Sequence, residues 1–137
     1  MAYGFRFAYR LSGGAPTIQE FVFQDTETIT KGDLVSIESG LADLAASNDT
    51  TLAGVALETV AGTTNVSKIR VITDADAVYA VDDANARLAG ATLDITGTTG
   101  QQTIAASSDV DVIVVAASSA TEPTLVQIAH GEHFLRT

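Results

Sequence analysis

The sequence predicts an all-β fold, either a compact β-sandwich or a small β-barrel of about eight to ten short strands. Short runs in which apolar and polar residues alternate occur along the whole chain, as expected for half-buried strands. Segments rich in Gly, Asp, Asn, Ser and Thr separate these runs at intervals of about eight to twelve residues. A length of 137 residues and an apolar fraction of 46% suit one domain with a core of its own.

The stretch 31–58 forms the centre of the predicted domain. A glycine-containing turn opens it and leads into the run 34–38, in which Val35 and Ile37 point to the same side. A second apolar run, 52–58, follows a connection of small and polar residues. Two such runs separated by turn residues predict paired strands near the middle of the fold.

Ten segments in all carry the strand pattern. They cover residues 3–10, 20–24, 34–38, 52–58, 66–73, 77–81, 91–96, 102–105, 111–116 and 125–129. The run of branched residues within 111–116 predicts a strand covered on both faces. One short helix is expected at 82–89, with Asp82 or Asp83 as its N-cap and Gly90 after its last turn.

The N-terminal segment concentrates aromatic and basic side chains. A strand here would place four aromatic residues on one face and two arginines on the other. The residues are Tyr3, Phe5, Phe7 and Tyr9, and Arg6 and Arg10. Residues 1–18 contain these two bases and no acid, whereas the remaining residues carry 5 bases and 17 acids. The charge therefore divides the chain into an N-terminal segment and an acidic body.

Two interpretations of this segment stay open. The segment forms either an ordinary first strand whose aromatic residues fill the core, or an extended arm that lies on a partner. The Gly-Gly-Ala-Pro link at 13–16 favours an arm, because it is flexible and stops the strand pattern. The corresponding division is an N-terminal arm and linker, residues 1–18, followed by a single β domain, residues 19–137.

Composition excludes several function classes. A net charge of −10 argues against general binding to nucleic acid, which requires lysines and arginines to displace counterions, and against anionic membrane surfaces. No stretch approaches the length of an apolar membrane helix, and the N-terminus lacks the pattern of a signal peptide. We expect synthesis in the cytoplasm. Without cysteine, there are no disulfides and no thiolate metal sites.

No motif predicts catalysis. The aspartates of the segment 74–83 lack the spacing of an EF-hand loop, and His130 and His133 have no third histidine to complete a metal site. The segment 97–100 lacks the Gly-Lys-Ser/Thr ending of a phosphate-binding loop. The sequence therefore predicts a protein that is not an enzyme and has no metal and no cofactor.

The chain resembles the capsid decoration proteins of tailed bacteriophages, also called head-stabilising or cement proteins. The resemblance rests on three features: Lys31-Gly32-Asp33-Leu34-Val35 opening a strand, the run 52–58, and the Ala/Thr/Gly-rich strands that lead to 125–129. It implies a non-enzymatic homotrimer on the outer surface of the virion, bound to the major capsid protein. In that family an N-terminal segment often adds to a capsid-protein element, and here the corresponding residues are Tyr3, Phe5, Arg6, Phe7, Tyr9 and Arg10.

The expected function is to stabilise the shell by bridging capsid subunits. Three arms on one trimer would raise avidity, because the later arms bind intramolecularly. Two alternatives remain. One is a small β-barrel that binds a ligand or carbohydrate, and the other is a trimeric module of a phage tail or fibre.

Overall fold

The computed structural model describes residues 3–23, 28–47, 49–62, 67–106 and 110–135, which form thirteen strands and one 3-10 helix. The elements are β1 (Phe5–Arg10), β2 (Ile18–Val22), β3 (Thr28–Ile29), β4 (Leu34–Glu38), β5 (Leu41–Leu44), β6 (Leu52–Val55), β7 (Val60–Ala61), β8 (Lys68–Ile72), β9 (Ala77–Val81), β10 (Thr92–Thr96), β11 (Thr103–Ala106), β12 (Val112–Ala116), β13 (Thr124–Ile128) and η1 (His130–Glu132). The predicted all-β class is confirmed. No helix among the described residues is long and apolar enough to cross a membrane.

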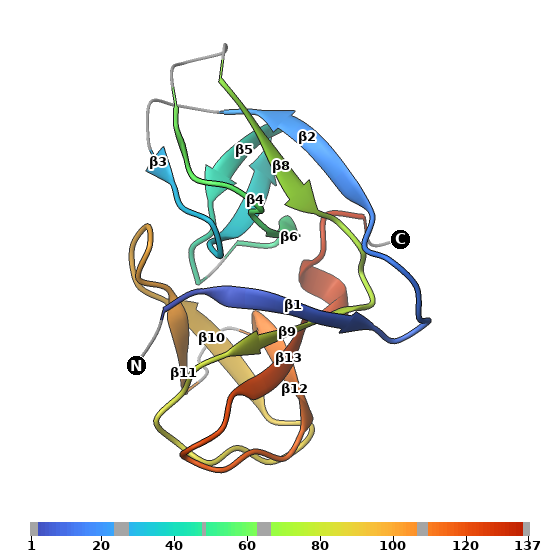
Figure 1. Cartoon of the computed structure of the whole chain (residues 1–137), viewed down its shortest axis with the longest axis vertical. Coiled ribbons are helices and arrows are strands. Elements are labelled where there is room, and N and C mark those ends of the chain that lie inside the picture. Colours follow the sequence, from blue (N-terminus) through green and yellow to red (C-terminus); the bar gives the residue numbers. More distant parts are fainter. Residues whose placement is uncertain (1–2, 24–27, 48, 63–66, 107–109, 136–137) are drawn as a thin grey trace.

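The strands divide into one large sheet and a group of smaller ones. The large sheet has the order β1-β9-β13-β12-β10-β11, so that β1 and β11 are its edges. The smaller sheets are β5-β4-β6, β2-β8 and β3-β7. Figure 1 shows the large sheet below and the smaller ones above, with β1 lying across the middle of the molecule.

Two hydrophobic clusters fill the interior, and strands β4, β6 and β8 contribute to both of them. Because successive side chains of a strand point to opposite faces, neighbouring residues enter different clusters. The neighbouring pairs are Leu34 and Val35, Leu52 and Ala53, and Ile72 and Val71, of which the first member packs with the large sheet and the second with the smaller sheets. These three strands are therefore the shared layer that joins the two halves.

The predicted pairing of the runs 34–38 and 52–58 is confirmed by β4 and β6, although β6 ends at Val55 and β4 is buried on both faces rather than one. Strand β4 pairs with β6 through Leu34–Val55 and Val35–Gly54, and it also pairs with β5, which the sequence did not predict. A buried carboxylate fixes the turn before β4, because Asp33 Oδ2 accepts a hydrogen bond of 2.8 Å from the Thr30 amide. The other oxygen, Oδ1, accepts one of 2.9 Å from the Gly100 amide. The 97–100 loop therefore secures the start of β4.

The predicted helix at 82–89 is wrong, because the backbone there bonds across to another segment. Arg87 and Ser118 form an antiparallel bridge in which the Arg87 amide donates to the Ser118 carbonyl at 3.3 Å and the Ser118 amide donates to the Arg87 carbonyl at 2.9 Å. A helix of two turns is marginal in water, so these cross-chain bonds decide the conformation. Strand β12 also differs from the prediction, since only alternate residues, Val112 and Val114, are buried.

Candidate functional site

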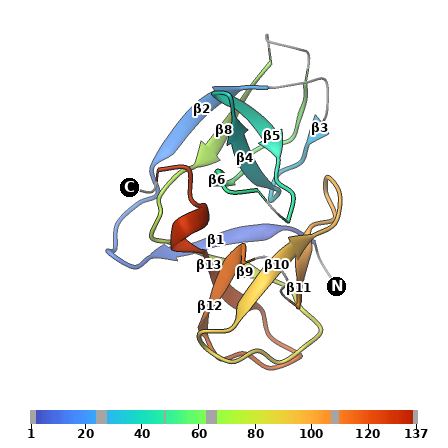
Figure 2. The same cartoon turned by 180° about the vertical axis from the view of Figure 1, so that it is seen from behind.

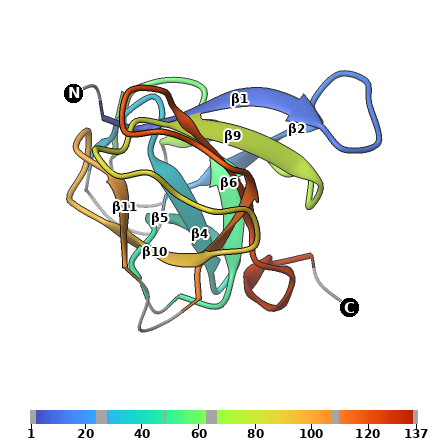
Figure 3. The ribbon, with the colours of Figure 1, turned by 90° about the horizontal axis from the view of Figure 1, so that it is seen from below.

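The N-terminal segment is the edge strand of the large sheet. Strand β1 pairs with β9 in antiparallel register, from Phe5–Val81 to Arg10–Ala77. Figure 3 shows β1 lying along β9, with the connection to β2 extending beyond the sheets. Of the two open interpretations, the structure therefore places residues 5–10 as a first strand packed on the chain's own body, rather than as an arm that leaves it.

The four aromatic residues do not share one face. Phe5 is only 2% exposed and belongs to the core, and Phe7 packs against that core with its ring 6.5 Å from the ring of Tyr79. A bulge between Phe7 and Tyr9 then shifts the register. Tyr9 is left 42% exposed, and Tyr3, ahead of the strand, is 50% exposed. The predicted single aromatic face is therefore wrong, because sequence alternation does not reveal a bulge.

Both arginines of the segment form ion pairs within the chain. Arg6 lies 3.0 Å from Asp82 across the β1–β9 pair, and Arg10 lies 3.1 Å from Asp76. Hydrogen bonds from the Ser12 hydroxyl and amide, together with the Arg10 guanidinium, lower the pKa of Asp76 to about 2. Arg10 and Ser12 thus tie the end of β1 to the 74–76 turn.

A groove of about 450 Å³ runs beside β1. Its walls come from β1, from the turn before β4 and from the end of β6, and Ile72 of β8 also lines it. The lining residues are Tyr3, Phe5, Arg6, Phe7, Lys31, Gly32, Val55, Ala56, Leu57 and Ile72. None of them is acidic, although the chain has 17 acids. The groove is therefore an apolar surface with two cations.

The main chain of β1 is open on the groove side. The Phe5 amide donates to the Gly32 carbonyl at 2.8 Å and thus points away from β9. Because backbone groups alternate in direction along a strand, the amide and carbonyl of Phe7 also point away from β9. Among the described residues no hydrogen bond to the Phe7 amide or carbonyl occurs on that side. With respect to the described residues, this edge therefore offers the Phe7 amide as a donor and the Phe7 carbonyl as an acceptor.

Lys31 contributes a cation without a carboxylate partner in the described part of the chain. The other described cations, Arg6, Arg10, Lys68, Arg70 and Arg87, all form ion pairs. From the sequence, Lys31 is expected only in a turn and Leu57 only in a strand. The one local sequence signal in this part of the groove is Gly32. In the structure its φ is 95°, and its close approach to Gly4 brings the turn against β1. Nothing in the sequence pairs those two glycines.

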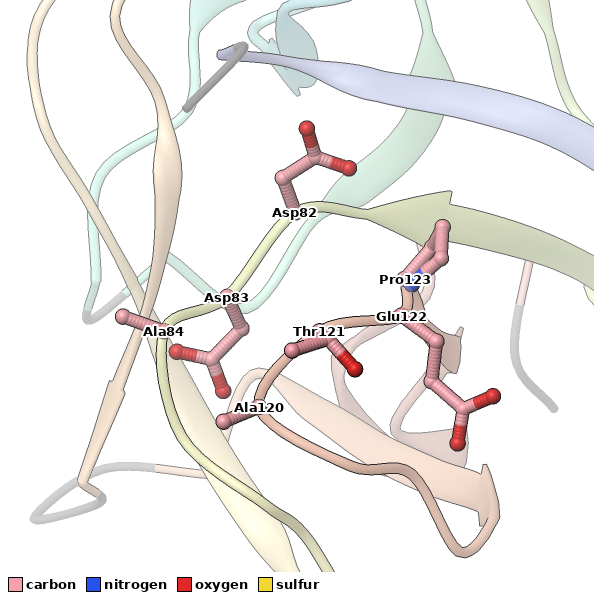
Figure 4. Close-up of a pocket in the computed structure, with 7 residues that line it drawn as sticks. All are labelled: Asp82, Asp83, Ala84, Ala120, Thr121, Glu122 and Pro123. Atoms are coloured by element: carbon pink, nitrogen blue, oxygen red, sulfur yellow. The ribbon is translucent and has the colours of Figure 1, made fainter.

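A second hollow, of about 260 Å³, lies between the 82–84 and 120–123 loops and is acidic. Figure 4 shows that the carboxylates of Asp82, Asp83 and Glu122 point in different directions rather than toward one centre. Asp83 is committed to Arg87 at 2.5 Å, and Asp82 to Arg6. No group of three or more possible metal ligands occurs among the described residues. Two of the acids in this hollow, Asp82 and Asp83, are therefore used in ion pairs within the chain.

His133 also has a structural position. Its ring is 1% exposed and lies 3.1 Å from the Ala53 carbonyl through Nε2, while Nδ1 accepts a hydrogen bond of 3.0 Å from the Leu135 amide. Burial lowers its pKa, because the charged ring would lose hydration. Figure 2 shows this C-terminal segment beside β6. The ring holds residues 133–135 against the shared layer.

Comparisons with known proteins show a likeness in fold. No protein-family model matches the sequence, and no curated protein matches it. The chain is similar to a crystal structure described as the head fiber gp8.5 N base in bacteriophage phi29, with a TM-score of 0.53 and 17% sequence identity. The match covers 85% of this chain and 98% of that one. The chain thus shares the fold of almost the whole of that base.

Proposed function

We propose that this chain is a non-enzymatic structural protein of a tailed-phage head. It sits on the outer surface of the capsid, bridges neighbouring copies of the major capsid protein and assembles as a homotrimer. The observation that carries the proposal is the shared fold with a head fiber base over 98% of that base. A fold likeness alone does not transfer function, so the remaining support comes from the surface of this chain.

The distribution of charge supports attachment at one face. The chain has a net charge of −10, which keeps proteins soluble and apart at high local concentration. The groove beside β1 is free of acids and apolar, whereas the 82–84 and 120–123 loops are acidic. An apolar, acid-free surface on an acidic body suits a contact with a shell, while the acidic surfaces keep decorated particles from associating.

Binding to heads tests the proposal directly. Purified chain would be titrated against mature heads that lack it, and the bound particles would be imaged by electron cryomicroscopy. We expect saturable binding, extra density at three-fold or quasi-three-fold positions, and the mass of a trimer in light scattering. Decorated heads should also retain DNA to a higher temperature than bare heads. Binding that does not saturate, or density inside the shell, would contradict the proposal.

The second candidate is a fibre base, which the description of the similar structure favours. A fibre base also attaches to the head, but it carries a further elongated module outward. Imaging separates the two candidates. A cement protein gives compact density that touches several capsid subunits, whereas a base gives one attachment point beneath a fibre.

A further inference from the structure

We propose that the groove beside β1 binds an extended segment of the capsid protein, which adds as a strand to β1 and places a carboxylate at Lys31. This inference rests on the proposed function and names the surface and the chemistry of its contact. The occupant has apolar side chains at alternate positions and an acidic residue at the end that meets the turn before β4.

The open edge of β1 supplies the main-chain part of the contact. The Phe7 amide and carbonyl point away from β9 and make no hydrogen bond on the groove side within the described residues. A polypeptide strand offers the matching carbonyl and amide at the spacing of a sheet ladder. This pairing favours an extended peptide over a compact ligand.

The walls supply the side-chain part. Phe7 and Leu57 are partly buried and lie on different walls, and Val55 and Ile72 are buried residues of the lining. Side chains on one face of an added strand would meet this apolar lining, because alternate residues of a strand share a face.

The charges that line the groove favour an occupant with an acidic residue. Lys31 is exposed and belongs to none of the ion pairs among the described residues, and no lining residue is acidic. A carboxylate on the partner would therefore meet an available cation and no like charge, which favours both encounter and register.

Charge substitutions at two groove positions test the contact. Affinity for mature heads would be measured for the natural chain and for Leu57→Glu, Leu57→Lys and Lys31→Glu. Lys68→Glu is the matched control, because Lys68 lies on β8 outside the groove lining and its reversal changes net charge equally. Chemical denaturation and light scattering would check that each variant folds and keeps its oligomeric state.

We expect Leu57→Glu and Lys31→Glu to weaken binding by at least about tenfold, because they place an acid against the partner's acid. Leu57→Lys should weaken it much less, and Lys68→Glu should leave it within about threefold.

Three results would overturn the inference while the proposed function stands. One is head binding by the natural chain that Leu57→Glu and Lys31→Glu do not alter. Another is an equal loss of affinity in Leu57→Glu and Leu57→Lys, which would show that the partner does not place an acidic residue at this position. The last is a change of oligomeric mass in the groove variants, which would assign the groove to a second copy. Failure of the natural chain to bind heads would instead overturn the proposed function, and this inference with it.

Discussion

The groove beside β1 and the hollow between the 82–84 and 120–123 loops differ in their lining residues and in whether their charged side chains are paired. The groove beside β1 is apolar and free of acids, and its cation Lys31 has no ion-pair partner among the described residues. The hollow between the 82–84 and 120–123 loops is acidic, but Asp82 and Asp83 are each paired with an arginine. Paired charges stabilise the chain's own loops, whereas a cation that no described residue pairs, beside a strand edge that no described residue covers, is available to a partner.

The two regions also differ in what supports them. The groove is lined in part by the shared layer, through Val55 of β6 and Ile72 of β8. The acidic hollow is built from loops, and the Arg87–Asp83 ion pair and the Arg87–Ser118 backbone bridge help to hold them. A change in the shared layer should therefore damage the whole fold, whereas a change in the loops should remain local.

The largest effect is expected when the shared layer beneath the groove is overpacked by Gly54→Ala. A Cβ atom at Gly54 would lie 1.7 Å from the Ile72 carbonyl oxygen and 2.8 Å from the Tyr79 hydroxyl. Because the first of these neighbours is backbone, β6 and β8 would have to separate. We expect a loss of about 3 kcal/mol or more in the free energy of unfolding, measured by chemical denaturation.

Gly131→Ala is the matched control for this substitution. Nothing lies within 4 Å of a Cβ atom at Gly131, and its φ is not positive. We expect its stability to remain within about 0.5 kcal/mol of the natural chain. Equal stabilities for the two alanine variants would show that β6 and β8 do not approach as closely as described.

Close contacts of this kind mark the limit of what the sequence could predict about the fold. The segments 34–38 and 77–81 were predicted to the residue, because apolar alternation and flanking turns are local signals. Strand β5 was missed, because Leu41–Leu44 has no β-branched residue and is extended by its pairing with β4. Pairing with a distant segment also explains why the predicted helix at 82–89 does not form, because Arg87 bonds to Ser118.

The candidate site was predicted in part. The sequence identified residues 3–10 as a strand that carries aromatic and basic residues, and β1 confirms the strand. It could not tell whether this strand would pair with a partner or with β9, because that pairing joins residues more than sixty positions apart. Lys31 and Leu57 gave no signal as site residues, since the groove exists only once segments that are distant in the sequence meet. Their role in binding, like that of Tyr3 and Tyr9, stays a prediction.

A smaller effect is expected at the acidic hollow, from Asp83→Asn. The Asp83 side chain is 5% exposed and holds Arg87, itself 16% exposed, and the substitution would leave that guanidinium poorly paired. We expect a loss of about 2 kcal/mol in the free energy of unfolding, below the range for a fully buried pair because Arg87 reaches solvent. Affinity for phage heads should not change in this variant, since the hollow is outside the groove.

Asp82→Asn is the neighbouring control. Its partner Arg6 is 47% exposed, and exposed pairs contribute less than about 1 kcal/mol. If Asp82→Asn costs more stability than Asp83→Asn, the contrast between an exposed and a buried pair in these loops is wrong. If Asp83→Asn weakens head binding without loss of stability, the acidic loops belong to the contact surface.

The smallest and most gradual effect concerns His133, which packs behind β6. Nε2 faces the Ala53 carbonyl and Nδ1 accepts from the Leu135 amide, so the neutral ring with its proton on Nε2 satisfies both contacts. A proton added to Nδ1 would face the Leu135 N–H. Burial lowers the pKa of His133 in the folded chain, although hydrogen bonds to the backbone of Ala53 and Thr73 and the charge of Asp74 partly oppose this.

The sign of the pH dependence follows from that shift. Because the folded pKa lies below the ordinary value of 6.5, the unfolded chain binds more protons as the pH falls through 6.5. Stability from this group is complete above pH 6.5 and decreases below it, by at most about 1.4 kcal/mol per pH unit for one proton. Glu38 acts in the opposite direction, because burial and nearby acids raise its pKa.

Comparison with His133→Gln isolates the histidine, since glutamine does not titrate and Glu38 is present in both chains. We expect the stability difference between the natural chain and this variant to shrink as the pH is lowered from 7.5 to 5.5, measured by denaturation at constant ionic strength. Parallel stability curves would show that His133 does not titrate differently in the two states. In that case, a neutral His133 ring would not be what holds the C-terminal segment against β6. The β6 wall of the groove would then depend only on the packing of the two hydrophobic clusters.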